Sequence, residues 1–359
     1  MNTKVMRACV CLVLCTGLAS LTSAQKYKVT DLGVLPGDSS SIGNWLNNSG
    51  HVVGCSDPSS GGGGVICQEN TAGQHAFLWT EKHGLLDLGT LPGGNISQAT
   101  GINDSDEIVG YSYTNEGTPH GFRWTRKSRV MEDLGTLPGG TFSEAVALNP
   151  NETVVGWSDY QGSAGQTDAV MWDHQGTIQD LGKLSGAESA NAGAINDHNE
   201  VVGYSTFTSG VFHAFFWTKA EGFRDLGTLP GGTFSFPGYI NDSGLIVGLS
   251  DSAKNPGVGE CVFWDRNFKI HLVGVFKGGC GLFGANDLGS AVGQGTLASG
   301  TGFAVLWSKE TGIRNLNKSI SKDSGWLLVG ASSINLSGQI SGWGVINGEN
   351  HGFLLTPTK

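Results

Sequence analysis

The sequence predicts an all-β protein: a seven-bladed β-propeller of four-stranded antiparallel blades, its ring closed by the N-terminal strand joining the last blade. Three observations lead to this prediction. One strand-and-turn motif recurs seven times at intervals of about 46 residues. Each copy contains four short apolar runs separated by Gly, Asn, Asp and Pro. The first and last copies are fragments that together make one complete unit.

The most regular motif is an apolar residue followed by Asn, a short polar turn and then Val-Gly or a close variant. Its seven copies are centred on Asn47, Asn103, Asn149, Asn196, Asn241, Asn286 and Asn335. Segments such as Asn-Asp-Ser-Gly at 241–244 have the composition of hairpin turns. The motif therefore predicts one strand before the Asn and a second strand after the turn. We expect the Gly of the second strand to let an aromatic ring lie against the backbone.

Two further motifs complete each unit. A third apolar run ends in Trp79, Trp124, Trp172, Trp217, Trp264 and Trp307, spaced by 43 to 48 residues, and in Leu355 in the last copy. An Asp-Leu-Gly run follows at Asp31, Asp87, Asp133, Asp180 and Asp225, often continued by Thr-Leu-Pro-Gly-Gly. Short apolar runs bounded by turn residues are typical of strands. Four strands in such a unit match a propeller blade, whereas a β-helix coil is usually shorter and an open stack needs special caps.

The two ends of the repeat region predict that the ring is closed. Residues 27–33 contain an Asp-Leu-Gly strand with no other strand of its unit before it. The final Phe353-Leu354-Leu355 run has no Asp-Leu-Gly strand after it. Pairing these fragments would complete the seventh blade and remove two exposed sheet edges.

The first 24 residues have the pattern of a secretory signal peptide. Lys4 and Arg7 precede an apolar run, 8–21, that is too short to span a bilayer, and Ala24 ends a plausible cleavage site. We therefore expect cleavage near Ala24, a single domain over 25–359, and a secreted location, extracellular or periplasmic. Residues 25–359 have a formal charge of −12, because the signal segment holds two basic and no acidic residues. This charge argues against nucleic acid as a partner, and no later segment is apolar enough for membrane insertion.

Four cysteines remain after the signal segment: Cys55, Cys67, Cys261 and Cys280. An even number in an exported chain predicts two disulfides. Three pairings are possible, and we favour Cys55–Cys67 with Cys261–Cys280 because each pair brackets one local excursion of the chain. A zinc site is the alternative, but the Cys-x-x-Cys spacing is missing.

The repeats resemble a known family. His75-Ala76-Phe77 and His213-Ala214-Phe215, together with Asp-Leu-Gly-Thr-Leu-Pro-Gly-Gly and Ile-Asn-Asp, are similar to the bacterial extracellular HAF-repeat family. The resemblance covers residues 27–355, and the last two units depart from it most. It implies export and a β-repeat structure, and it carries no defined activity.

The candidate binding surface is one rim of the predicted ring. In a propeller, the loops after the second and fourth strands of each blade share a rim, which would receive Asn95, Phe142 and Phe234. Aromatic residues at the strand position after Val-Gly, which are Tyr111, Trp157 and Tyr204, could stack on sugars. Packing between blades is the favoured alternative for these three residues.

Other candidate sites have simpler structural explanations. The repeated His75, His120, His213 and His351 would lie far apart, so hydrogen-bonded structural histidines are favoured over a metal ring. The Asn-Asp turns supply too few carboxylates for calcium, and turn chemistry is favoured. The Pro-Gly-Gly segments lack the helix and Lys of a phosphate site, and we expect them to connect blades. The sequence thus indicates no metal, no cofactor and no catalytic residue.

The function that these observations favour is a secreted, non-catalytic binding protein for an unknown extracellular ligand, with a glycan and a protein as the two ligand classes considered. Repeats of similar chemistry suit multivalent recognition. The alternative is an extracellular polysaccharide-acting enzyme, a hydrolase or lyase, on a propeller scaffold. That function needs unlike groups converging at one place. The candidates for such groups are scattered in the sequence and show no shared context: His51, Glu69, His174, His198 and His271. A structural role without a ligand is the third possibility.

Overall fold

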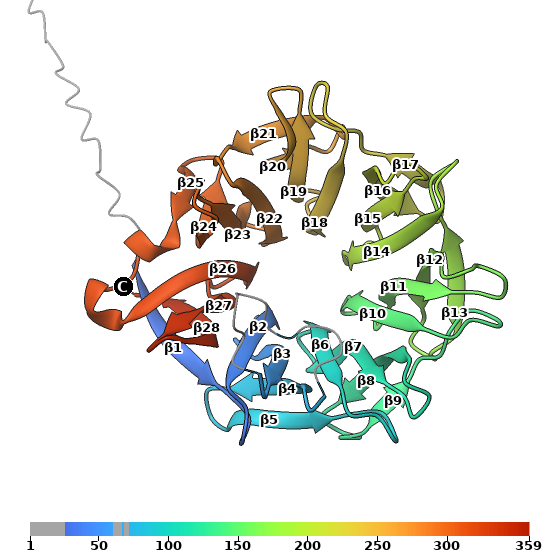
Figure 1. The fold of residues 1–359 in the computed structure, drawn as a ribbon, viewed down its shortest axis with the longest axis horizontal. Coiled ribbons are helices and arrows are strands. Elements are labelled where there is room, and N and C mark those ends of the chain that lie inside the picture. The colour runs from blue at the N-terminus through green and yellow to red at the C-terminus, as the bar shows by residue number, and fades with distance from the viewer. Residues whose placement is uncertain (1–25, 60–66, 68–71, 359) are drawn as a thin grey trace, which may run out of the picture.

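A computed structural model describes residues 26–59, 67 and 72–358, and it shows seven four-stranded antiparallel sheets arranged as blades around a central channel (Figure 1). The predicted seven-bladed β-propeller is therefore confirmed. The proposed signal peptide, residues 1–24, lies outside the described residues. No helix in the described part of the chain is long and apolar enough to cross a membrane.

The strands of each blade, from the channel outwards, are called A, B, C and D. Blade 1 contains β2 (Ser40–Leu46), β3 (Val52–Asp57), β4 (His75–Thr80) and β5 (Gly84–Gly89). Blade 2 contains β6 (Ser97–Ile102), β7 (Glu107–Tyr113), β8 (Pro119–Thr125) and β9 (Met131–Asp133). Blade 3 contains β10 (Ser143–Leu148), β11 (Val154–Asp159), β12 (Thr167–Trp172) and β13 (Ile178–Gly182). Blade 4 contains β14 (Ser189–Ile195), β15 (Val201–Thr206), β16 (Phe212–Thr218) and β17 (Gly222–Asp225).

The remaining blades follow the same order. Blade 5 contains β18 (Ser235–Ile240), β19 (Ile246–Ser252), β20 (Asn255–Trp264) and β21 (Ile270–Gly274). Blade 6 contains β22 (Gly279–Ala285), β23 (Ser290–Thr296), β24 (Gly302–Ser308) and β25 (Gly312–Asn315). Two 3-10 turns follow, η1 (Leu316–Lys318) and η2 (Lys322–Ser324). Blade 7 contains β26 (Trp326–Ile334), β27 (Ile340–Ile346), β28 (Glu349–Pro357) and β1 (Tyr27–Gly33).

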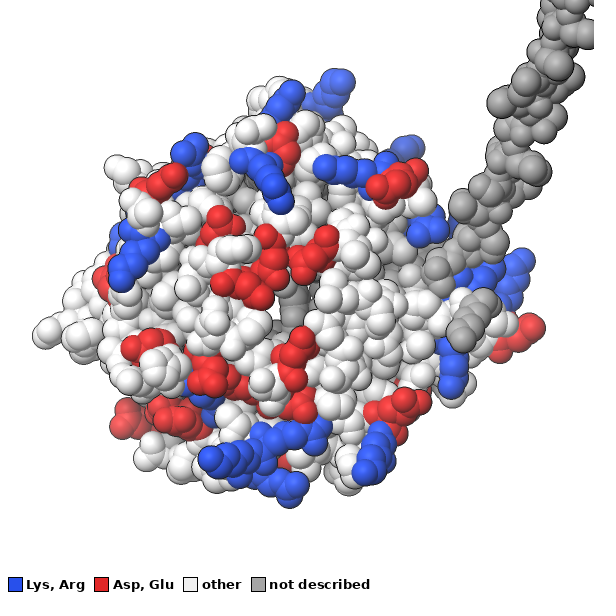
Figure 2. All heavy atoms as spheres, turned by 180° about the vertical axis from the view of Figure 1, so that it is seen from behind, with Lys and Arg blue, Asp and Glu red and all other residues white. Residues whose placement is uncertain are grey.

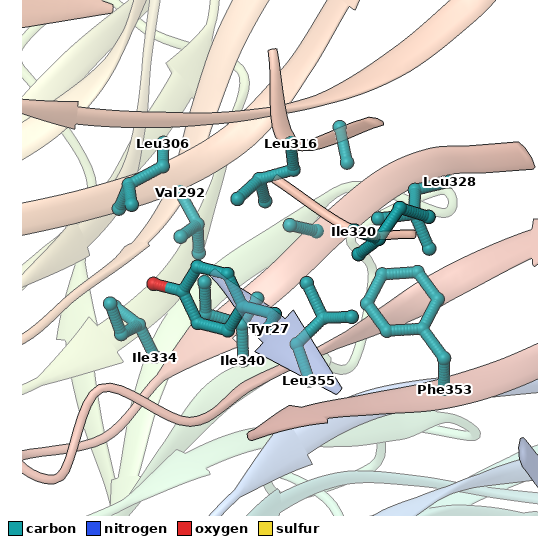
Figure 3. Packing of buried hydrophobic residues seen from close by; sticks show 12 residues of the cluster. Tyr27, Val292, Leu306, Leu316, Ile320, Leu328, Ile334, Ile340, Phe353 and Leu355 are labelled. Atoms are coloured by element: carbon teal, nitrogen blue, oxygen red, sulfur yellow. The ribbon is translucent and has the colours of Figure 1, made fainter. Parts of the chain in front are cut away.

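The ring closes as the sequence predicts. Strand β1 pairs antiparallel with β28, with Tyr27 opposite Pro357 and Asp31 opposite Phe353. The ring of Tyr27 is buried in a cluster that includes Leu355, Ile320 and Leu328 (Figure 3). The first described strand is therefore held to blade 7 by both a hydrogen-bond ladder and a hydrophobic core.

The hydrophobic core lies between neighbouring blades rather than in one central mass. One cluster, for example, joins Val53 and Leu78 of blade 1 to Ile108 and Phe122 of blade 2. The strand C Trp residues contribute to this packing, and the indole N–H of Trp172 donates to the Leu134 carbonyl of the preceding blade at 2.9 Å. Each blade is thus stabilised mainly by the faces that it shares with its two neighbours.

A β-bulge recurs in strand A of every blade. The register with strand B shifts between Gly43 and Trp45, and at the equivalent place in the other six blades. A Cβ on Gly54 of strand B would lie 1.8 Å from the Ile42 carbonyl oxygen and 3.1 Å from the Phe77 ring. The expected close approach of an aromatic ring to this Gly is confirmed, but the bulged carbonyl is the nearer obstacle and the main reason for Gly.

The turns after strand A form a hydrogen-bonded ring around the channel. In six of the seven blades the Asn side-chain amide donates to the main-chain carbonyl of the equivalent Asn in the next blade, over 2.8 to 3.2 Å. Asn103 is the exception, and its amide donates to the Glu107 carboxylate. The Asn Oδ1 atoms accept main-chain N–H groups of their own turns, as at Ser49 and His51. Turn chemistry, the favoured interpretation of these motifs, is confirmed.

Both predicted disulfides are present. Cys55 is bonded to Cys67, and Cys261 is bonded to Cys280. The second bond joins β20 of blade 5 to β22 of blade 6, so it links two neighbouring blades covalently. The half-buried Trp343 of blade 7 packs against the Cys55–Cys67 pair.

Candidate functional site

The ring has two chemically different faces. The turn face is formed by the A–B turns, such as 47–51, and by the C–D turns, such as 80–84. The loop face is formed by the D–A connections, such as 90–96, and by the B–C loops, such as 113–119. Contacts between these two kinds of loop, such as the Gly73 N–H to the Asn95 carbonyl at 3.0 Å, place them on one rim. The Pro-Gly-Gly segments are the D–A connections, as expected.

An aromatic row crosses the loop face at the junction of blades 4 and 5. Ring centroids of Phe236 and Tyr204 are 4.9 Å apart, those of Tyr204 and Phe212 are 6.0 Å apart, and those of Phe212 and Phe234 are 5.1 Å apart. All four side chains are half-buried. At the position of Phe212 the other described blades carry Gln74, Pro119, Thr167, Gly259, Thr301 and Asn350. The row is therefore unique to one place on the ring.

A buried carboxylate holds Phe234 in position. Asp251 accepts the main-chain N–H groups of Thr233 and Phe234 at 2.6 and 2.9 Å, and its other oxygen accepts the Thr233 hydroxyl. Burial alone would raise the pKa of Asp251, but these donors and the Gly257 N–H together lower it. Asp159 holds Phe142 of blade 3 through the same contacts. The bases of both Phe side chains are therefore fixed.

The six residues predicted for the binding rim fall into three groups. Tyr204 and Phe234 come together in the aromatic row, through Phe212 and Phe236. Asn95 is exposed and Phe142 half-buried on the loop face, but they lie at other blade junctions. Tyr111 is buried and its hydroxyl donates to Gln98 at 3.0 Å, while Trp157 is half-buried beside Glu144 of its own sheet. The role of these residues in binding stays a prediction.

Phe212 and Phe236 were not predicted as site residues. The signal that could have found them is a departure from the repeat, because both are aromatic where the other copies carry mostly polar or small residues. Their meeting with Tyr204 depends on the packing of blade 4 on blade 5. Sequence spacing alone does not contain that information.

Four repeated His–Asp pairs lie around the circumference. His75, His120, His213 and His351 bond through Nδ1 to Asp87, Asp133, Asp225 and Asp31, over distances of 2.9 to 3.1 Å. In each pair both residues belong to one blade, as expected for hydrogen-bonded structural histidines. The hydrogen bond that His75 donates to the Asp87 carboxylate raises the pKa of His75. The pKa values of His120 and His351 are raised in the same way by their bonds to Asp133 and Asp31.

The channel mouth on the turn face is acidic. Acidic side chains gather around the central opening in Figure 2, and Asp104, Asp197, Asp242 and Asp287 line it. Burial and the neighbouring carboxylates raise the pKa of Asp197, and burial raises that of Asp287. Deeper in the channel, the rings of Trp45 and Tyr239 from blades 1 and 5 meet with centroids 5.1 Å apart. The channel is therefore narrowed by two aromatic rings that face each other across it.

Three of the four carboxylates that line this mouth already have structural partners. Asp104, Asp242 and Asp287 each accept the main-chain N–H of the equivalent residue in the preceding blade, at 2.8 to 2.9 Å. The series is interrupted at Pro150, which has neither a carboxylate nor a main-chain N–H, and at Leu336, which has no carboxylate. Among the described residues, no group of three or more His, Cys, Asp or Glu side chains is placed to hold a metal ion.

Comparison with solved structures supports the fold alone. A puromycin hydrolase is similar over 90% of this chain and 52% of its own length, with a TM-score of 0.59 and 10% identity. A puromycin-hydrolyzing peptidase of Mycobacterium tuberculosis is similar over 87% and 51%, with a TM-score of 0.52 and 11% identity. This chain therefore spans about half the length of these two hydrolases. It covers 65% of TolB from Acinetobacter baumannii, with a TM-score of 0.42 and 11% identity. No protein-family model and no curated protein matches the sequence.

One sequence-based conclusion needs correction. The sequence around His51 suggests no partner for its side chain. In the structure, however, its Nδ1 lies 2.7 Å from Asp106 Oδ1 of the next blade. Asp106 also accepts a hydrogen bond from Arg126 Nε at 2.5 Å. Unlike groups from two blades therefore converge on the turn face, although they are up to 75 residues apart in the sequence.

Proposed function

We propose that this chain is an exported, non-catalytic binding protein that recognises an extracellular carbohydrate through the aromatic row of its loop face. The proposal includes removal of residues 1–24 as a signal peptide and membership of the HAF-repeat family. Two disulfides in the described residues are consistent with an oxidising compartment.

The observation on which this proposal rests is the row formed by Tyr204, Phe212, Phe234 and Phe236. Half-buried aromatic rings offer apolar faces to the C–H faces of sugar rings, and their stiff side chains lose little conformational entropy on binding. The backbone behind Phe234 is held by Asp251, so the row is preorganised. Asn191, whose amide donates to the Tyr204 hydroxyl at 3.2 Å, adds polar groups beside the rings.

A glycan array with the full mature chain tests this function. We expect carbohydrate binding that is weakened at least tenfold by Phe212→Ala combined with Phe234→Leu. Phe268→Ala is the matched control, because Phe268 is a half-buried aromatic residue that lines a pocket on the turn face. Thermal unfolding of each variant checks that the ring remains folded.

Two results would count against the proposal. Binding that is unchanged in the Phe212/Phe234 variant would separate recognition from the aromatic row. Release of new reducing or unsaturated ends from a bound polysaccharide would favour the alternative, an extracellular hydrolase or lyase. Capture of a protein in place of glycans would keep the loop face as the binding surface and change the ligand class.

A further inference from the structure

A cleft on the turn face lies where the ring closes. Its volume is about 680 Å³, within the range of sites that bind small ligands. Lys28 and Thr30 of β1 and Thr356 of β28 form one wall, and the A–B and C–D turns of blade 1 form the other. Arg126 reaches the cleft from blade 2. The cleft is therefore built from three blades and includes the strand that completes the ring.

The cleft is basic although the chain is acidic. Lys28, Lys82 and Arg126 line it, with Glu81 as the single acidic lining residue, whereas the whole sequence has a formal charge of −10. Within the described residues, the side chains of Lys28 and Lys82 have no hydrogen-bond or ion-pair partner. Figure 2 shows that basic side chains gather toward the edge of this face, whereas acidic side chains surround its centre. Lys28 and Lys82 are thus cationic groups in the cleft that no described side chain neutralises.

Asp106 orients two further donors at the cleft wall. It is 8% exposed, and its Oδ1 accepts the Asn47 amide at 2.9 Å in addition to its contact with His51. The Nε–H of Arg126 donates to Asp106. The two terminal nitrogens of the guanidinium have no hydrogen-bond or ion-pair partner among residues 26–59, 67 and 72–358. The Nε2 atom of His51 also has no hydrogen-bond partner among these residues. A guanidinium held in this way presents a planar pair of N–H donors suited to an oxyanion.

This network does not belong to the repeat. The position of His51 carries Glu107, Thr153, Glu200, Leu245, Ser290 and Gln339 in the other blades. Asp106 has a φ of 58°, a left-handed conformation that the equivalent turns mostly assign to Gly. Glu152 and Asn199 occupy the equivalent position in blades 3 and 4 with φ values of 61° and 58°. What sets Asp106 apart is that its carboxylate holds both His51 and Arg126.

The neutral lining of the cleft suits a sugar ring. Thr30, Thr80, Thr356 and Gln339 supply hydroxyl and amide groups, and Trp79 supplies an apolar surface. We propose that this cleft binds a short acidic oligosaccharide, with the carboxylate or sulfate of one sugar placed against Arg126, Lys28 and Lys82. The site lies on the opposite face from the aromatic row, so it does not depend on the function proposed above.

Isothermal titration calorimetry of the full mature chain with four probes tests the site. The probes are a galacturonate trisaccharide, its methyl-esterified form, a sulfated disaccharide and inorganic sulfate. We expect the trisaccharide, the sulfated disaccharide or both to bind, and the probe that binds identifies the preferred anionic group as carboxylate or sulfate. The methyl-esterified trisaccharide should bind at least tenfold more weakly than the acid. Binding should weaken as salt concentration rises, because charge attracts the ligand.

Two variants and one control locate the binding. Lys28→Gln with Lys82→Gln removes two charges that have no structural partner, so folding should be preserved, and Arg126→Gln removes the oriented guanidinium. Each should weaken binding at least tenfold. Lys219→Gln, an exposed Lys in the C–D turn of blade 4 on the same face, should have no effect.

Equal binding of the acid and its methyl ester would overturn the proposal. So would the absence of binding to both acidic sugars, or equal loss of affinity in Lys219→Gln. Binding of inorganic sulfate alone would reduce the cleft to a simple anion site and would also overturn it. None of these results changes the expected loss of carbohydrate binding in the Phe212/Phe234 variant. The proposal for this cleft and the proposal for the aromatic row can therefore fail independently.

Discussion

The side-chain amide of Asn335 donates to the main-chain carbonyl of Asn47 at 3.0 Å, across 288 residues of sequence. This bond closes the series of amides that surrounds the channel, at the same seam where β1 completes blade 7. The donor and acceptor groups are the same as in the bonds between consecutive blades, an Asn side-chain amide and an Asn main-chain carbonyl. The turns of blades 7 and 1 are therefore joined as firmly as turns that are neighbours in the sequence.

Replacing Asn335 with Ala should destabilise the ring more than the same change at Asn103. Both variants lose Oδ1 as an acceptor for two main-chain N–H groups of the turn. Only Asn335→Ala also removes a donor that joins two blades. The Asn47 carbonyl keeps the Gly50 N–H as a donor. The additional loss is therefore that of one hydrogen bond between blades, and we expect a difference of about 1 kcal/mol in the free energy of unfolding. Urea unfolding measures this difference. Equal losses of stability in the two variants would show that the hydrogen bond between the blades makes no net contribution.

Replacing Tyr27 with Ala should weaken ring closure directly. Tyr27 is 7% exposed and packs against Leu355 and Ile320, and loss of a buried aromatic side chain costs about 3–5 kcal/mol. We expect the main-chain amides of β28 to lose hydrogen-exchange protection before those of β15 in blade 4. Lys28→Ala, at an exposed position of the same strand, is the control. Uniform loss of protection over all blades would show that the seam is no weaker than any other junction.

Much of the fold could be predicted because each strand has its own sequence marker. Asn ends strand A, Gly lies in strand B, Trp ends strand C, and Asp-Leu-Gly forms strand D. The closure between residues 27–33 and 349–357 followed from two incomplete units, and both disulfides followed from local spacing. These inferences need only the order of motifs along the chain.

The bulge in strand A and the ring of Asn amides could not be predicted in the same way. They depend on main-chain geometry and on the distance between successive blades, which no single motif encodes. The same holds for the candidate sites. Phe212 meets Phe234, and His51 meets Asp106 and Arg126, only because neighbouring blades bring their turns together. The sequence indicated the loop face, but it did not show which residues would be neighbours on either face.

Removing the disulfide between Cys261 and Cys280 should destabilise the protein by about 3 kcal/mol, because it closes a short loop in the unfolded chain. The double variant Cys261→Ala with Cys280→Ala tests this by urea unfolding under oxidising conditions. Since the bond joins β20 to β22, hydrogen exchange should accelerate first at the junction of blades 5 and 6. The wild-type chain under reducing conditions should lose at least as much stability, because both of its disulfides open. A double variant as stable as the wild type would show that packing alone holds this junction.

The His–Asp pairs should make the stability of the ring depend on pH. The pKa values of His75, His120 and His351 are raised by the hydrogen bonds that they donate to their Asp partners, so their contribution is fully present below the unfolded His value of about 6.5. That contribution is lost as pH rises through the raised folded values. Burial would raise the pKa values of Asp31, Asp87 and Asp133, but hydrogen bonds from His and from Gly N–H groups lower them. Their contribution is present above about pH 4 and is lost as pH falls through the lowered folded values.

The pairs should therefore stabilise the protein most between about pH 4 and pH 6.5. Solvent screens these partly exposed pairs, so each is expected to contribute about 0.2–1 kcal/mol. Urea unfolding at a series of pH values should show that the free energy of unfolding falls between pH 6 and pH 9. The triple variant His75→Asn, His120→Asn and His351→Asn should reduce that fall. His174→Asn is the control, because the His174 imidazole forms no ion pair within the described residues. If the triple variant kept the wild-type pH dependence, the decline would have to come from other titrating groups.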